Sequence, residues 1–112
     1  MHVFHSRMVP AETYPGAKGV AIRWAIGENV DAPNFYLRVI DVAVGAATGW
    51  HQHAWEHEVF VLAGVGAARD SDGERPIESG SCVYVAPNEL HQFINRGDEP
   101  LRFICVIPKP AG

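Results

Sequence analysis

Residues 51–64 read His-Gln-His-Ala-Trp-Glu-His-Glu-Val-Phe-Val-Leu-Ala-Gly, and this stretch decides how the rest of the chain is interpreted. It gathers three histidines and two glutamates into eight residues and then becomes an apolar run. Side chains two positions apart on an extended chain point to the same side, so His51 and His53 form part of a predicted metal-binding site. His91, within the later stretch 86–95, is the candidate for the remaining ligand from elsewhere in the chain.

The composition is that of one soluble globular domain. The chain has 112 residues, of which 47% are hydrophobic and 20% charged, and its formal net charge is -4. A chain of this length buries about two-thirds of its unfolded surface, so a core can form without disulfides. The nine Lys and Arg residues are scattered along the chain, which argues against nucleic acid or a membrane surface as a partner.

The sequence also predicts a cellular compartment. No apolar run approaches the roughly 18 residues of a transmembrane helix, and residues 1–7 lack the apolar middle of a signal peptide. These features predict a cytoplasmic protein. In a reducing cytoplasm, Cys82 and Cys105 are expected to be free thiols.

Outside the histidine stretch, short β-type segments alternate with turns rich in glycine and proline. No ten-residue segment has helical periodicity bounded by caps. The pattern predicts an all-β sandwich or barrel at residues 20–112, preceded by an N-terminal arm at residues 1–19 with a weak strand signal at residues 3–4. A hairpin turn is expected at residues 70–73. The predicted strands are residues 20–26, 35–44, 58–63, 67–69, 82–86, 91–95 and 101–107.

The histidine stretch and His91 together resemble the two motifs of the cupin superfamily. The first motif is filled by Gly45, His51, His53, a ligand at 57 or 58, and Gly64, and the second by Gly80, Pro87, His91 and Asn95. Over residues 20–110 the amino-acid sequence is similar to that of the small manganese-binding four-histidine cupins. That resemblance rests on Trp-Glu-His-Glu at 55–58, Pro-Asn-Glu at 87–89 and Cys-Val-Ile-Pro-Lys at 105–109. It implies a cupin jelly-roll barrel of two antiparallel sheets.

One departure from the family pattern lies in the second motif. Asn88-Glu89 stands where a glycine is usual in the turn before His91. Asparagine tolerates the left-handed backbone conformation, so we expect the turn to survive.

The third ligand is ambiguous from the residues alone. His57 and Glu58 are neighbours, so on a strand they face opposite sides and only one of them can reach a metal. The other residues on both faces of this strand are apolar, so the hydrophobic pattern does not show whether His57 or Glu58 faces the core. The resemblance to four-histidine cupins favours His57.

The ligands implied by the resemblance are His51, His53, His57 and His91. Four neutral imidazoles suit Mn²⁺, Fe²⁺, Ni²⁺, Cu²⁺ and Zn²⁺, and the resemblance favours Mn²⁺. An octahedral ion with four protein ligands keeps two neighbouring positions open, for a chelating substrate or for substrate and dioxygen. The expected function is therefore that of a dioxygenase-type enzyme that oxidises a small hydrophobic, phenolic or alkenyl molecule.

Strand parity and the resemblance add four residues to the expected pocket. Phe93 follows His91 by two positions, and Phe103 shares a strand face with Cys105. Phe93 and Phe103 are candidate cofactor-binding residues, although both also suit an ordinary core. Arg38 and Cys105 are candidate catalytic residues. The alternatives are an edge arginine that reaches water and a small buried hydrophobe.

Two other classes of function fit the same residues. A metal-containing binding or sensing module without turnover is one, because no obvious general base stands beside the ligands. A redox-neutral isomerase acting on a sugar or keto acid is the other, and it ranks last because the expected pocket is apolar. The resemblance further implies a homodimer whose sheets pair through an N-terminal strand within residues 1–26.

Overall fold

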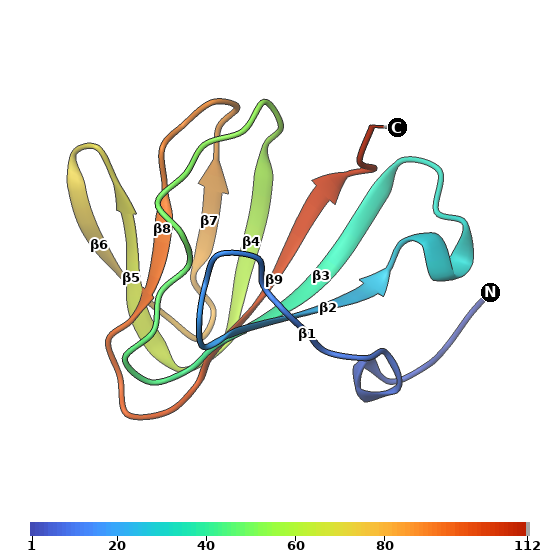
Figure 1. The fold of residues 1–112 in the computed structure, drawn as a ribbon, viewed down its shortest axis with the longest axis horizontal. Coiled ribbons are helices and arrows are strands. Elements are labelled where there is room, and N and C mark those ends of the chain that lie inside the picture. The colour runs from blue at the N-terminus through green and yellow to red at the C-terminus, as the bar shows by residue number, and fades with distance from the viewer. Residues whose placement is uncertain (112) are drawn as a thin grey trace.

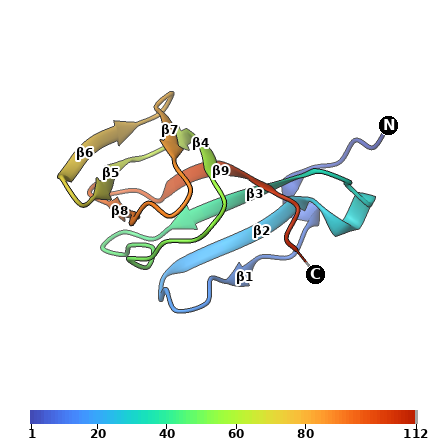
Figure 2. The ribbon, with the colours of Figure 1, turned by 90° about the horizontal axis from the view of Figure 1, so that it is seen from above.

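Alternation of buried and exposed side chains builds two antiparallel sheets, which pack face to face in a computed structural model that describes residues 1–111 (Figures 1 and 2). The larger sheet has the order β1-β2-β3-β9-β4-β7 and the smaller sheet the order β6-β5-β8. The strands are β1 (Glu12–Thr13), β2 (Val20–Ile26), β3 (Phe35–Val42), β4 (His57–Ala63), β5 (Val65–Asp70), β6 (Gly73–Glu78), β7 (Cys82–Val85), β8 (Gln92–Asn95) and β9 (Leu101–Pro108). The predicted all-β jelly-roll fold is confirmed.

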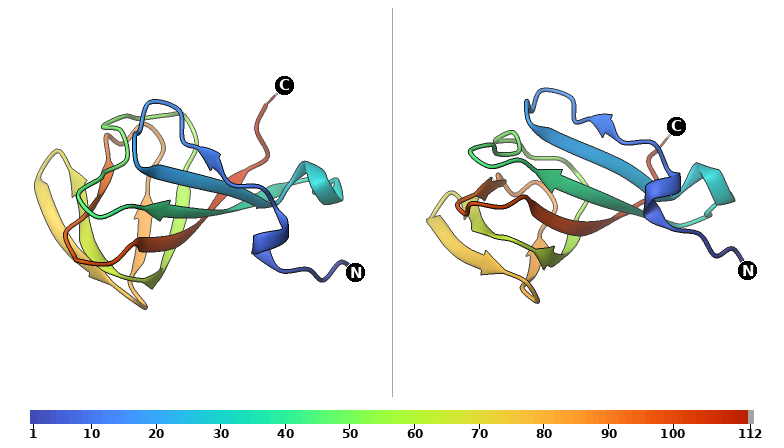
Figure 3. Two further views of the ribbon diagram at one scale, coloured as in Figure 1. Left: turned by 60° about the horizontal axis from the view of Figure 1, so that its bottom comes forward. Right: turned by 90° about the horizontal axis from the view of Figure 1, so that it is seen from below.

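The core lies between the two sheets and is centred on β9 (Figure 3). β9 pairs along its whole length with β3, from Phe35 opposite Pro108 to Val42 opposite Leu101, and pairs with β4 on its other side. Every second residue of β9 is buried, as expected for a strand with one face toward the core. The most deeply buried side chains are Val42, Val61, Leu101, Phe103 and Cys105.

Two strands were missed by the sequence prediction, the two-residue β1 (Glu12–Thr13) and β6. β6 (Gly73–Glu78) follows the predicted hairpin turn and pairs with β5, with Pro76 opposite Ala67. Proline lacks an N–H donor and is tolerated in sheets on edge strands, and β6 is an edge of the smaller sheet. Its polar Glu-Arg-Pro sequence carries no alternating apolar signal. The strand at residues 35–44 was predicted too long, because β3 ends at Val42.

The N-terminal arm is joined to the larger sheet. Glu12 and Thr13 form β1, which pairs with β2 opposite Ile22 and Ala21. The weak strand signal at residues 3–4 was wrong, since these residues belong to none of the strands that the structure describes. The short 3-10 turns η1 (Ser6–Met8) and η2 (Glu28–Val30) are the helical elements found within residues 1–111.

None of these helical elements is long and apolar enough to cross a membrane. Cys82 is exposed and Cys105 is buried, and both are free. The cytoplasmic location and the homodimer stay predictions.

The turn before His91 has the backbone conformation expected of its asparagine. Asn88 lies at a φ of 64°, in the left-handed region, and its N–H donates to the carbonyl of His53 at 2.7 Å. A residue with a Cβ and no short polar side chain is disfavoured there. The departure at Asn88 therefore preserves the turn that joins the two histidine segments.

We predict that Asn88→Ala lowers the free energy of unfolding by about 1 kcal/mol, the usual cost of the left-handed conformation for an ordinary residue. Asn88→Gly is the matched control and should stay close to the wild type, because glycine carries no Cβ. Urea unfolding of the three proteins measures the difference. Equal stability of the alanine and glycine variants would contradict the conformational explanation.

Candidate metal centre

The four candidate ligands come from two segments that the backbone ties together. His51 and His53 lie in the connection between β3 and β4, His57 begins β4, and His91 directly precedes β8. His51 and His91 form an isolated antiparallel bridge, in which each N–H donates to the other's carbonyl at 3.3 and 3.0 Å. This pairing brings together histidines that are far apart in the sequence.

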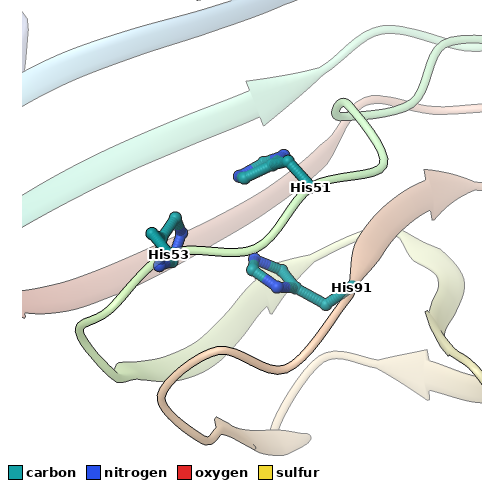
Figure 4. Close-up of side chains that lie close together, drawn as sticks. All are labelled: His51, His53 and His91. Carbon is teal, nitrogen blue, oxygen red and sulfur yellow. The ribbon is translucent and has the colours of Figure 1, made fainter.

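Three of the rings converge on one point. Ring nitrogens of His51, His53 and His91 all lie within 4.8 Å of one another, and Figure 4 shows the three rings turned toward a common centre. His57 joins this group through His53, because their Nε2 atoms are 2.6 Å apart. That separation is a hydrogen-bonding distance, so His57 lies beside the three converging rings rather than among them.

A backbone carbonyl orients each of the three converging rings. In every case Nδ1 lies within hydrogen-bonding distance of a carbonyl two residues away. A carbonyl only accepts, so Nδ1 carries the hydrogen and Nε2 keeps its lone pair, which is the form that binds a metal. The contacts join His51 to Gly49 (2.6 Å), His53 to Trp55 (3.1 Å) and His91 to Glu89 (2.8 Å).

Burial favours the neutral form of His53, His57 and His91. Loss of solvent lowers the pKa of His53 and His91, and burial together with the charge of Arg38 lowers the pKa of His57 to about 2. A neutral imidazole is a ligand and an imidazolium is not, so protons compete weakly with a metal here. By tautomer and convergence, the rings of His51, His53 and His91 fit a divalent transition ion.

The structure separates the two alternatives for the third ligand. His57 is 4% exposed and shares the inner face of β4 with Val59 and Val61. Glu58 is exposed on the outer face, opposite Tyr84 of β7. His57 therefore lies on the side of the histidine cluster, and Glu58 points away from it.

Arg38 lies directly behind His57. It is 4% exposed, so it does not reach water as an edge arginine would. Its NH2 group donates to Cys105 Sγ at 3.0 Å and lies 3.2 Å from His57 Nδ1, while Cys105 Sγ lies 2.7 Å from the same Nδ1. Burial raises the pKa of the Cys105 thiol, so the sulfur is protonated at neutral pH.

The charge of Arg38 has no acidic partner. Its Nε is buried and forms no hydrogen bond to any residue in the described range 1–111. The ion pairs found in the same range use Arg75, Arg96 and Arg102. Isolated buried charges are costly, so an unpaired guanidinium beside the candidate metal ligands needs a functional explanation.

A hollow of about 370 Å³ opens beside the cluster, and we call it the metal-side hollow. Its wall is mostly apolar, and the charged or imidazole side chains that line it are Glu12, Arg38, His53 and His57. Volumes of about 300–1,000 Å³ are typical of small-molecule sites. The hollow is lined by Glu12, Tyr14, Pro15, Ile22, Trp24, Arg38, His53, Trp55, His57, Ile107 and Pro110.

The two predicted phenylalanines line a smaller interior cavity, which they share with Arg38, Cys105, His51, His57 and His91. Phe93 and Phe103 are 4% and 1% exposed, and their rings pack 4.8 Å apart behind the histidines. Neither lines the metal-side hollow. The 6.2 Å separation between the rings of Phe93 and His91 makes Phe93 a supporting wall for that ligand.

Two tryptophans line the hollow instead. Trp55 stacks on His53 with ring centroids 4.5 Å apart and an angle of 2° between the planes, which braces the ligand loop. Trp24 of β2 lies 5.5 Å from the guanidinium carbon of Arg38. The sequence prediction treated Trp24 only as part of a strand. Its position two residues after Ile22, on the buried face, was the signal that could have found it.

Comparison with known proteins gives a consistent result. A profile of the cupin domain matches residues 38–107. The chain is 30% identical to the polyketide cyclase RemF from Streptomyces resistomycificus, whose structure superposes with a TM-score of 0.91 over 98% of this chain and 80% of that one. It is 33% identical over 64 residues to an oxalate-binding protein of Thermotoga maritima and 38% identical over 69 residues to a glucose-6-phosphate isomerase of Pyrococcus abyssi. Each match covers 56% of this chain, and the chain spans 53% and 36% of those two curated relatives.

We predict that His57→Ala weakens Mn²⁺ binding by at least about tenfold, whereas Glu58→Ala changes it by less than about twofold. The two residues are neighbours, so each variant controls for the local effect of the other. Isothermal titration of metal-free protein with Mn²⁺ measures both affinities. The assignment would be reversed if Glu58→Ala abolished binding and His57→Ala did not.

Proposed function

This chain belongs to the cupin domain family, and from that premise we propose that it is a metal-dependent enzyme that acts on a small phenolic or enolic molecule. The proposed ligands are His51, His53, His57 and His91. Mn²⁺ is the first candidate ion, because the sequence resembles manganese-binding cupins. The convergence of neutral imidazole nitrogens supports a divalent transition ion in general.

The observation that carries the choice of substrate is the unpaired Arg38. Its guanidinium is buried, lines the metal-side hollow and has an Nε without a partner among residues 1–111. No ion pair found among residues 1–111 involves Arg38, and a substrate oxygen that bears negative charge would supply the missing counter-charge to the guanidinium. Phenols and enols acquire such a charge when they lose a proton, and a buried guanidinium stabilises it strongly.

The rest of the hollow supports an aromatic or otherwise unsaturated carbon skeleton. Trp24, Trp55 and Ile107 give flat apolar walls, against which a ring can stack. A sugar phosphate would place several hydroxyl groups and a phosphate against these walls. The proposed substrate is therefore a small planar molecule with an acidic oxygen at one end.

The reaction we propose first is redox-neutral ring closure of an enolisable ketone. The likeness to RemF, a polyketide cyclase that is similar over 98% of this chain, supports this choice. A divalent ion in the site would supply Lewis acidity, which polarises a carbonyl. Arg38 would donate hydrogen bonds to the oxygen on which negative charge develops, and the apolar walls would exclude water.

The second candidate reaction is dioxygenase-type oxidation of the same class of substrate. It is supported by the histidine cluster, because Mn²⁺ or Fe²⁺ held by His51, His53, His91 and His57 would supply the redox chemistry that such an oxidation needs. In this case Arg38 would hold the substrate oxygen in the same way. The two reactions differ in one measurable respect, since only the second consumes dioxygen.

We predict that metal-loaded protein converts heptane-2,4,6-trione to 3,5-dihydroxytoluene and one water under anaerobic conditions. One terminal methyl carbon attacks the far ketone, and loss of water then gives the aromatic ring without any change in overall oxidation state. Chromatography of the product, beside metal-free protein as a control, measures the conversion. Dioxygen uptake with catechol and no anaerobic conversion of the triketone would favour the dioxygenase. Tight catechol binding without either reaction would favour a binding module.

We also predict that Arg38→Met weakens binding of catechol to the metal-loaded protein by at least about tenfold, the loss expected for a charge-assisted hydrogen bond. The melting temperature should not fall, because methionine fills similar space and removes a buried unpaired charge. Titration calorimetry and thermal unfolding give the two readouts. Unchanged catechol affinity would show that Arg38 is structural.

A further inference from the structure

We propose that the substrate is longer than the metal-side hollow and that its far end binds in a second hollow, which we call the distal hollow. This inference rests on the proposed function, since it assumes that the reacting end lies beside the histidines. The distal hollow has a volume of about 330 Å³. It is lined by Glu12, Trp24, Glu28, Asn29, Tyr36 and Pro110.

The two hollows adjoin. Glu12, Trp24 and Pro110 line both of them, so the hollows form successive parts of one groove over the β1, β2 and β3 end of the larger sheet. Each part alone has the volume of a small-molecule site. A molecule of one ring would leave the distal part empty, whereas a planar molecule of two or three rings would occupy both.

An aromatic series connects the two parts. The guanidinium of Arg38 lies 5.5 Å from the ring of Trp24, and the Trp24 ring meets that of Tyr36 edge to face at 6.1 Å and 85°. Arg38 and Trp24 line the metal-side hollow, while Trp24 and Tyr36 line the distal one. A flat ring system can therefore keep aromatic contacts along the whole groove.

The wall of the distal hollow is held in place before any ligand binds. Tyr36 is 5% exposed, and a Cβ at Gly27 would lie 3.0 Å from its ring, so Gly27 lets the backbone pack closely against Tyr36. Asn29 accepts from the Gly27 N–H at 2.8 Å and donates to the Ala25 carbonyl at 2.9 Å. These contacts fix the turn at η2, which makes the hollow a preformed subsite.

The charges along the groove are ordered. Of the two hollows, Arg38 lines only the metal-side one and Glu28 only the distal one, while Glu12 lies where they meet. Carboxylates accept hydrogen bonds from hydroxyl groups and repel anions. The groove is thus suited to a multi-ring polyphenol whose acidic oxygen lies at the metal end and whose far end carries no phosphate, carboxylate or sulfonate.

Two probes with the same chelating unit test the inference. Catechol has one ring, and alizarin carries the same pair of neighbouring hydroxyl groups on a three-ring uncharged skeleton. Glu28 lines only the distal hollow and is exposed, so Glu28→Trp should fill that hollow without disturbing the core. Glu99 is exposed and lines neither hollow, which makes Glu99→Trp the matched control.

With metal-loaded protein, we expect Glu28→Trp to weaken alizarin binding by about tenfold and to leave catechol binding unchanged. Glu99→Trp should change neither, and thermal unfolding of both variants should match the wild type. The inference is overturned if Glu28→Trp weakens the binding of both probes equally or of neither. In that case, catechol binding by the wild type would still support the proposed function. If the wild type binds neither probe, the proposed function and the inference fall together.

Discussion

The backbone bridge between His51 and His91 is the contact on which the rest of the site depends. It joins the connection before β4 to the start of β8, so the two histidine segments share one end of the barrel. Carbonyl contacts to Nδ1 then fix the direction of each converging ring. The ligand geometry thus follows from main-chain hydrogen bonds, which surface substitutions cannot easily change. The left-handed Asn88, which donates to the His53 carbonyl, belongs to the same arrangement.

The second constraint is the buried charge of Arg38. A fold selected for stability alone would place an apolar residue at this position, because an unpaired guanidinium in a core lowers stability. Arg38 instead touches Cys105 and His57 and leaves its Nε free. This arrangement gives the protein a fixed positive charge beside the metal ligands and in an apolar hollow. The hollow is therefore prepared for a negatively charged oxygen, whichever of the two proposed reactions takes place there.

The sequence predicted the fold class and the histidine cluster because both depend on local patterns. Alternation of apolar and polar residues indicates a strand with one buried face. The His-x-His pattern indicates two candidate metal ligands on the same side of an extended chain. β6 was missed because Pro76 and its charged neighbours carry no such pattern. Local pattern could not choose between His57 and Glu58, because the answer depends on which face of β4 meets the smaller sheet. The groove lined by Glu12, Trp24 and Tyr36 could not be predicted either, since it forms where β1, β2 and β3 meet.

We propose that the protein ligands of the divalent ion are all imidazoles. X-ray absorption spectroscopy of the Mn²⁺-loaded protein distinguishes such ligands, because imidazole rings give a characteristic multiple-scattering pattern beyond the first shell. We expect the pattern of at least three coordinated imidazoles, contributed by the converging residues His51, His53 and His91, with His57 as the proposed fourth. A spectrum of oxygen ligands without imidazole scattering, or protein that takes up no ion, would contradict it.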